Sequence, residues 1–192
     1  MAKRQNYDIS MDSIHLEGSL FVPDMLEKVA KGNAPYQSTS DYHIPKGIKL
    51  TDEFGRAFQI ALAQWKDFKA SWDREDIDHL QVTQNFMVEL FSDSLGWSGL
   101  KKTKTVRIGE FGYPVQFLGP SEVPMTVTEF NKSIDDSAEH FAVTNSGYRK
   151  RTPFQMSQEF LNSREFQGWG VVTNGKQVRL LRSSATLARP QY

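Results

Sequence analysis

The stretch WGVVTNGKQVRLLR, residues 169–182, carries the strongest signal of local structure in this chain. Two apolar, β-rich runs flank Asn174-Gly175, and an Asn-Gly pair supplies the two positive-φ residues of a type I′ turn. The spacing predicts a β-hairpin with strands at 169–173 and 177–182. The second strand carries arginines, so the chain is expected to end in a sheet that has one basic strand.

A helix with complete start signals precedes this hairpin. Thr152 can cap it, Pro153 suits the first helical position, and Gln155 can reach back to the capping N–H. These signals predict a helix over 153–163. Before it, strands are expected at 105–109, 114–118 and 123–130, and a polar, mobile loop at 133–150.

The first half of the chain has helical rather than alternating periodicity. Apolar residues recur at steps of three and four over 54–72, which predicts a long helix with that stripe in the core. A second helix is expected from about Asp76 to Leu95, antiparallel to the first, and a shorter one from Pro23 to Gly32. We therefore expect an α+β fold in which a helical part, 1–96, precedes a mixed β-sheet with a packed helix, 97–192, in one compact unit.

Composition bounds the location and the partners. The 192 residues include no cysteine, which fits a reducing cytoplasm, and no apolar run is long enough to span a membrane. Residues 1–96 hold 10 Lys+Arg against 15 Asp+Glu, whereas residues 97–192 hold 13 against 8. This asymmetry predicts either a polyanion bound by the second half or complementary packing of the two halves.

Catalytic motifs are few. No glycine-rich nucleotide loop or nucleophile elbow is present, and the scattered histidines, His15, His43, His79 and His140, predict no metal site. The candidate centre is that of a Mg²⁺-dependent nuclease, with Glu129 and Lys132 on the stretch 124–132, taken as a strand, and Glu110 or Glu122 as the earlier carboxylate. Because Glu129 and Lys132 are three apart, an unbroken strand would point them to opposite faces. The alternative is a solvated strand with ordinary charges.

Basic residues are the second candidate. Lysines and arginines in the second half could hold the phosphates of DNA through salt-dependent contacts, or they could form a solubilising surface. The residues expected to bind DNA are Lys101, Lys102, Lys104, Arg149, Lys150, Arg151, Lys176 and Arg179.

Four segments together resemble the N-terminal region of large fused restriction–modification proteins. They are 16–26, 54–72, 151–162 and 169–182, and 183–192 is similar to the continuation of that family. The family includes type IIG enzymes and the adenine-specific DNA methyltransferases of DISARM-like phage-defence systems. The helix carrying Gln158 and the Asn174-Gly175 turn also resemble the closing half of the nuclease domain in type I restriction subunits.

The resemblance implies a restriction-nuclease-like α/β unit over 97–182 that binds DNA or positions a methyltransferase domain. The Glu-x-Lys motif of such nucleases is not intact, and the methyltransferase motifs are absent. The chain is therefore expected to be a fragment or a split subunit that lacks a cofactor of its own, with S-adenosylmethionine bound by the linked or partner methyltransferase. Two alternatives are an endonuclease with a rearranged Mg²⁺ site and a structural docking domain that never touches nucleic acid.

Overall fold

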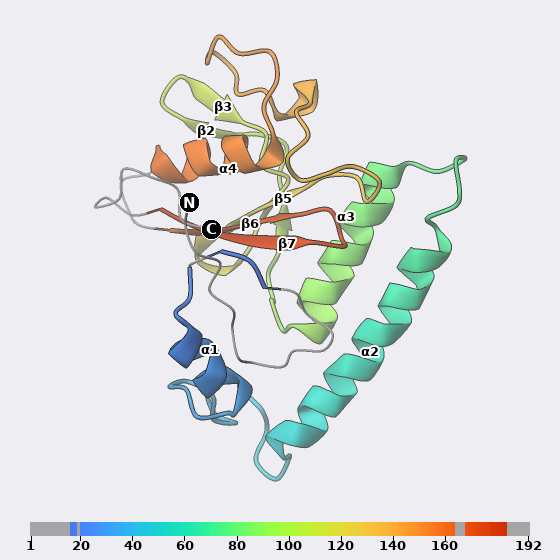
Figure 1. The fold of residues 1–192 in the computed structure, drawn as a ribbon, viewed down its shortest axis with the longest axis vertical. Helices are drawn as coiled ribbons and strands as arrows, with labels where there is room; N and C mark the ends of the chain where they lie inside the picture. Colours follow the sequence, from blue (N-terminus) through green and yellow to red (C-terminus); the bar gives the residue numbers. More distant parts are fainter. Residues whose placement is uncertain (1–15, 19, 164–167, 184–192) are drawn as a thin grey trace.

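The computed structural model describes residues 16–18, 20–163 and 168–183, which fold into layers around one mixed β-sheet (Figure 1). Helices α2 (Leu50–Ala70) and α3 (His79–Glu89) lie on one face of the sheet. Helix α4 (Pro153–Asn162) lies on the other face, together with a small two-stranded hairpin. The expected α+β class is confirmed.

The main sheet has five strands in the order β1-β4-β5-β6-β7. These are β1 (Lys101–Lys102), β4 (Phe117–Leu118), β5 (Pro124–Val127), β6 (Trp169–Thr173) and β7 (Val178–Arg182). Only β5 and β6 pair in parallel, and α4 supplies the crossover between them. The other pairs are antiparallel, so β1 and β7 form the two edges. A separate hairpin joins β2 (Val106–Ile108) to β3 (Phe111–Tyr113).

The alternation of side chains along the strands divides the core between the two faces. Met125, Val127 and Val171 pack with Phe68 and Phe86 of the α2–α3 layer. On the opposite face, Val172 and Leu181 pack with Leu161 of α4, and Thr126 bonds to Ser157 of α4 at 2.7 Å. The first cluster contains residues from both sides of position 96, so the helical part and the sheet share one core.

The helix starts follow their sequence signals. Helix α4 has the expected capping box, in which the Thr152 hydroxyl accepts from the Gln155 N–H and the Gln155 side chain accepts from the Thr152 N–H. Helix α1 (Pro23–Ala30) starts at Pro23 and is followed by Gly32 at a positive φ. Helix α3 starts at His79 rather than Asp76, because the Asp78 side chain caps it, and it continues as a π turn over Leu90–Ser94.

Five sequence expectations are corrected. The expected strand over 114–118 is reduced to the two residues of β4, with β3 ending before it at Tyr113, and the expected strand over 123–130 ends at Val127. The segment 133–150 is not simply a polar loop, because it contains a 3₁₀ turn (Glu139–Phe141) and buries Ile134, Phe141 and Val143. The apolar stripe of α2 is only partly core, since Phe54 and Phe58 are exposed.

The tip of the β6–β7 hairpin is the fifth correction. The hairpin forms as expected, but it is closed by the four residues 174–177 rather than by a two-residue type I′ turn. Gly175 has φ +81°, whereas Asn174 does not lie in the positive-φ region. Asn174 instead accepts the N–H groups of Lys176 and Gln177 through its side-chain oxygen, which favours an Asx-type turn.

Across the residues that the structure describes, no helix combines the length and the apolar character needed to cross a bilayer. The expected continuation of the family likeness over 184–192 lies outside the described residues.

Candidate functional site

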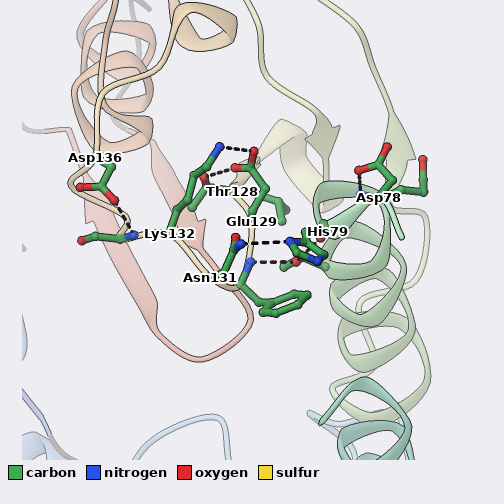
Figure 2. A network of polar contacts seen from close by, with 12 residues as sticks. Asp78, His79, Thr128, Glu129, Asn131, Lys132 and Asp136 are labelled. Atoms are coloured by element: carbon green, nitrogen blue, oxygen red, sulfur yellow. Dashed lines mark hydrogen bonds and ion pairs between the residues drawn. The ribbon is translucent and has the colours of Figure 1, made fainter. Parts of the chain in front are cut away.

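The candidate nuclease residues Glu129 and Lys132 lie just after the end of β5, where the chain turns (Figure 2). The Lys132 N–H donates to the Glu129 carbonyl at 3.0 Å, which closes the turn. Their side chains meet, with Lys132 Nζ 2.6 Å from Glu129 Oε1. An unbroken strand would have pointed them to opposite faces, but β5 ends at Val127, so the alternation of an extended strand does not extend to these two residues.

Glu129 is held as a carboxylate. Burial raises the pKa of Glu129, but hydrogen bonds from Lys132, from its own backbone and from the Thr128 hydroxyl outweigh burial and leave the pKa below its ordinary value. The Thr128 Oγ1 lies 2.8 Å from Glu129 Oε2. Both carboxylate oxygens therefore already accept hydrogen bonds within the chain.

Glu110 is not part of this group. It lies in the turn between β2 and β3, where its backbone carbonyl accepts from the Asn145 amide at 2.8 Å. Nowhere in the described ranges do three His, Cys, Asp or Glu side chains gather closely enough to hold a metal ion. Glu129 thus provides one carboxylate beside one lysine and belongs to no such group of three in the described part of the chain, whereas Mg²⁺ is held by several oxygen ligands.

The turn after β5 is anchored to α3 and to the hairpin tip. Asn131 contacts the His79 ring at 3.0 Å (Figure 2). The Phe130 N–H donates to the Thr83 hydroxyl at 3.1 Å. From the other side, the Asn174 amide donates to the Lys132 carbonyl at 2.8 Å. These contacts join the helical layer, the candidate centre and the Asn174-Gly175 turn.

The predicted DNA-binding residues separate into two groups. The first group is engaged within the chain: Arg179 forms a bidentate pair with Asp135, and Arg151 is paired with Glu159. Lys176 lies 3.9 Å above the Trp72 ring, and Lys102 reaches Gln81 at 3.5 Å. Their positive charges are therefore directed at neighbouring groups of the same chain.

The second group points to solvent. Lys101, Lys104 and Arg149 are exposed, and no carboxylate in the described part of the chain lies within ion-pair distance of them. Lys150 is 3.9 Å from Glu139, with both side chains more than half exposed, which makes it a weak pair. Arg107, on β2, is exposed in the same region.

The three predicted structural residues are packed inside the fold. Asn174 and Gln158 are buried, and Gln158 donates to Asn162 at 2.9 Å, while its side-chain oxygen has no hydrogen-bond partner among the described residues. Gly175 lies against α2, where a Cβ would come within 2.7 Å of Phe68. The segment Thr173-Asn174-Gly175 thus joins the sheet to the helical layer.

Sequence reasoning missed the acidic partners Asp135 and Glu159 and the buried Thr83. Glu159 lies within the expected helix and Asp135 within the expected loop, so neither follows a motif that marks it as a partner of a distant arginine. Thr83 lies 47 residues from Phe130, whose backbone N–H donates to the Thr83 hydroxyl. Only the tertiary fold brings these groups together.

No family model, curated protein or solved structure matches this chain.

Proposed function

We propose that this chain is an accessory module of a DNA restriction–modification or phage-defence methyltransferase, and that it positions the catalytic domain. The four segments that resemble such proteins support the class of system. The exposed apolar side chains of α1 and the first half of α2 support the positioning role. In this proposal the module has a restriction-nuclease-like fold and acts in the cytoplasm, and its partner binds S-adenosylmethionine.

The observation that carries the positioning role is the exposure of Phe54 and Phe58, at 50% and 62%. They lie one helical turn apart on α2, and the Tyr42 ring packs edge-on against Phe54 at 5.6 Å. The π turn that ends α3 lies beside Gln64 of α2. The part of α2 from Leu50 to Gln64, roughly 20 Å long, therefore extends beyond α3. Apolar surface of this kind on a soluble protein is typical of protein interfaces.

Helix α1 extends the same kind of surface. None of its residues is buried, and Met25 and Val29 are exposed on it. Phe21, just before it, stacks on Trp169 at the start of β6 with the ring centroids 5.9 Å apart. An amphipathic helix gains stability when a partner covers such a face. We therefore expect the methyltransferase domain to pack against α1 and α2.

Binding to the methyltransferase domain or subunit of the same system tests this proposal. Phe54→Ser/Phe58→Ser should weaken complex formation at least tenfold in isothermal titration calorimetry. Tyr148→Ser is the matched control, because Tyr148 is an aromatic residue that is 62% exposed in the loop before α4. Equal affinity of the double variant and the wild type would reject the proposed interface.

A second candidate function is metal-dependent DNA cleavage, favoured by the contact between Glu129 and Lys132. Purified protein would be incubated with supercoiled plasmid and Mg²⁺. Nicking that is lost in Glu129→Gln and kept in Glu110→Gln would establish a nuclease that uses Glu129. Intact plasmid over a range of Mg²⁺ concentrations would leave the positioning role as the function.

A further inference from the structure

The hairpin β2–β3 and the segment after the 3₁₀ turn form a short three-stranded ribbon. Arg107 pairs with Gly112 across the hairpin, and Gly112 forms a bridge with Thr144, whose N–H donates to the Gly112 carbonyl at 2.9 Å. A Cβ on Gly112 would lie 3.1 Å from both the Thr105 methyl group and the Thr144 hydroxyl. Thr105, Arg107, Gly112 and Thr144 therefore share one side of the ribbon, which we name the hairpin face.

The hairpin face points away from the protein core. Val106 and Ile108, which alternate with Arg107, pack against the cluster that contains Tyr113 and Phe141. Because neighbouring strand residues point in opposite directions, the Arg107 side chain is directed outward. Gly112 is itself buried, because the side chains of Thr105 and Thr144 close over it, so the exposed groups of the hairpin face are Thr105, Arg107 and Thr144.

Positive charge is concentrated in the segments that form and adjoin this face. The segments 101–113 and 138–151 together carry seven Lys and Arg residues but only two carboxylates, Glu110 and Glu139. Lys102 and Arg151 are held by Gln81 and Glu159. The remaining cations are Lys101, Lys104, Arg107, Arg149 and Lys150, all of them exposed.

Strand register determines which lysine of β1 belongs with them. Lys101 pairs with Leu118, which packs against the same cluster as the hairpin, whereas Lys102 pairs with Phe117 of the α2–α3 face. Cross-strand partners share a face of a sheet. Lys101 therefore lies on the same side of the sheet as the hairpin, and Lys102 lies on the opposite side.

We propose that the hairpin face and its exposed cations bind the phosphate backbone of duplex DNA. Arg107 would contact one phosphate, and Lys101, Lys104 and Arg149 would contact others, with the threonine hydroxyls as additional donors. Two strand spacings separate Arg107 from Thr144, or roughly 10 Å. Groups at the two ends of that distance could therefore contact different phosphates of one DNA strand. The contacts are to the backbone, so the binding is independent of sequence.

The chemistry favours duplex DNA over the other polyanions. Binding to single strands relies on exposed aromatic rings on which bases stack. Two exposed rings lie in this region. Tyr148 has the Arg151 guanidinium 3.7 Å from its centroid, which covers one of its faces, and His140 lies against Phe141 with the ring centroids 4.1 Å apart. Insertion into an anionic membrane needs exposed aliphatic or aromatic side chains beside the cations, and within 101–113 and 138–151 Tyr148 is the only large hydrophobic residue that is exposed.

This surface is separate from the proposed docking surface. Figure 1 shows β2 and β3 beside α4 at one end of the molecule and α1 at the other. A module with both surfaces could hold DNA with one end while the other end holds a catalytic domain. The two proposals fail independently, because Phe54→Ser/Phe58→Ser leaves the hairpin face unchanged and substitutions on the hairpin face leave α1 and α2 unchanged.

Fluorescence anisotropy with a labelled 30-base-pair duplex tests the proposal over a range of salt concentrations. Each phosphate contact contributes about 0.9 to the slope of log K against log salt concentration. Arg107→Gln/Arg149→Gln should therefore lower that slope by about 1.8. If the variant and the wild type bind equally at 1 M salt, this difference in slope makes the variant bind roughly 60-fold more weakly at 0.1 M salt. Lys66→Gln/Lys69→Gln removes the same charge from α2 and should leave the affinity within about twofold of the wild type.

Three outcomes would overturn the proposal. One is the absence of duplex binding by the wild-type protein at 50 mM salt. Another is an equal loss of affinity in the Arg107/Arg149 and Lys66/Lys69 variants, which would indicate a general effect of net charge. The third is tighter binding to a single strand of the same length, or to vesicles containing phosphatidylserine, than to the duplex.

Discussion

Replacing Gly175 by alanine should destabilise the protein far more than the same replacement at another glycine with a similar backbone conformation. Gly175 has φ +81°, and an added Cβ would lie 2.7 Å from Phe68 Cζ and 2.9 Å from Phe68 Cε1. Gly147 is the matched control, because it has φ +76° and no atom within 4 Å of the added Cβ. The difference between the two variants isolates the contact with the helical layer.

The magnitude follows from the packing around Phe68. Its ring stacks on Phe86 with the centroids 4.2 Å apart and lies edge-on to Trp72 and Phe130, so it cannot move aside. A positive φ costs an alanine roughly 1 kcal/mol, and overpacking of a core costs roughly 1 to 3 kcal/mol. We expect a loss of roughly 2 to 4 kcal/mol in Gly175→Ala and of roughly 1 kcal/mol in Gly147→Ala.

Urea denaturation followed by tryptophan fluorescence measures both free energies of unfolding. Phe68→Leu combined with Gly175→Ala should recover part of the loss caused by Gly175→Ala, because the smaller side chain makes room for the methyl group. If Gly175→Ala and Gly147→Ala differ by less than about 0.5 kcal/mol, the hairpin tip does not press against α2 as described and the reasoning is wrong.

Three further predictions concern the cap, an ion pair and the exposed stripe. Thr152→Ala should lower the free energy of unfolding by about 1 kcal/mol in urea denaturation, because the N-terminal cap of α4 is lost, whereas Thr152→Ser should restore most of it. Hydrogen bonds from Arg179 hold the pKa of Asp135 below its ordinary value, so the pair stabilises the fold at pH values above the unfolded-state pKa of about 4, and that stabilisation is lost as the pH falls through the lower folded-state pKa. Asp135→Asn should therefore flatten the decline of the melting temperature below pH 4, and an unchanged pH profile would contradict the assignment. Phe58→Ser should change the free energy of unfolding by less than about 1 kcal/mol, whereas Phe68→Ala, in the core, should cost roughly 3 to 5 kcal/mol in the same assay.

The local elements were predictable where a short motif carries its own physics. Thr152, Pro153 and Gln155 form the expected capping box, because all its partners lie within four residues. The hairpin over 169–182 also forms as expected, although its tip does not. There the Asn174 side chain bonds to the backbone of the turn and to Lys132, a distant partner that turn preferences do not include.

The candidate site was less predictable, because its chemistry depends on where a strand ends and which distant groups meet. In an unbroken strand, the alternation of side chains would point Glu129 and Lys132 to opposite faces. However, β5 ends at Val127, and the two side chains form an ion pair. Likewise, eight cations looked equivalent in the sequence, and half of them are engaged by Gln81, Trp72, Asp135 and Glu159.

The amino-acid sequence by itself determined the α+β class, the helix with its capping box and the β6–β7 hairpin, because periodicity, caps and turns act between residues close in the chain. The tertiary structure alone decided which apolar residues of α2 are buried, which cations remain exposed on the hairpin face, and that Gly175 must be a glycine. Those properties depend on contacts across tens of residues, and the sequence does not reveal which of its many possible long-range partners a side chain will meet.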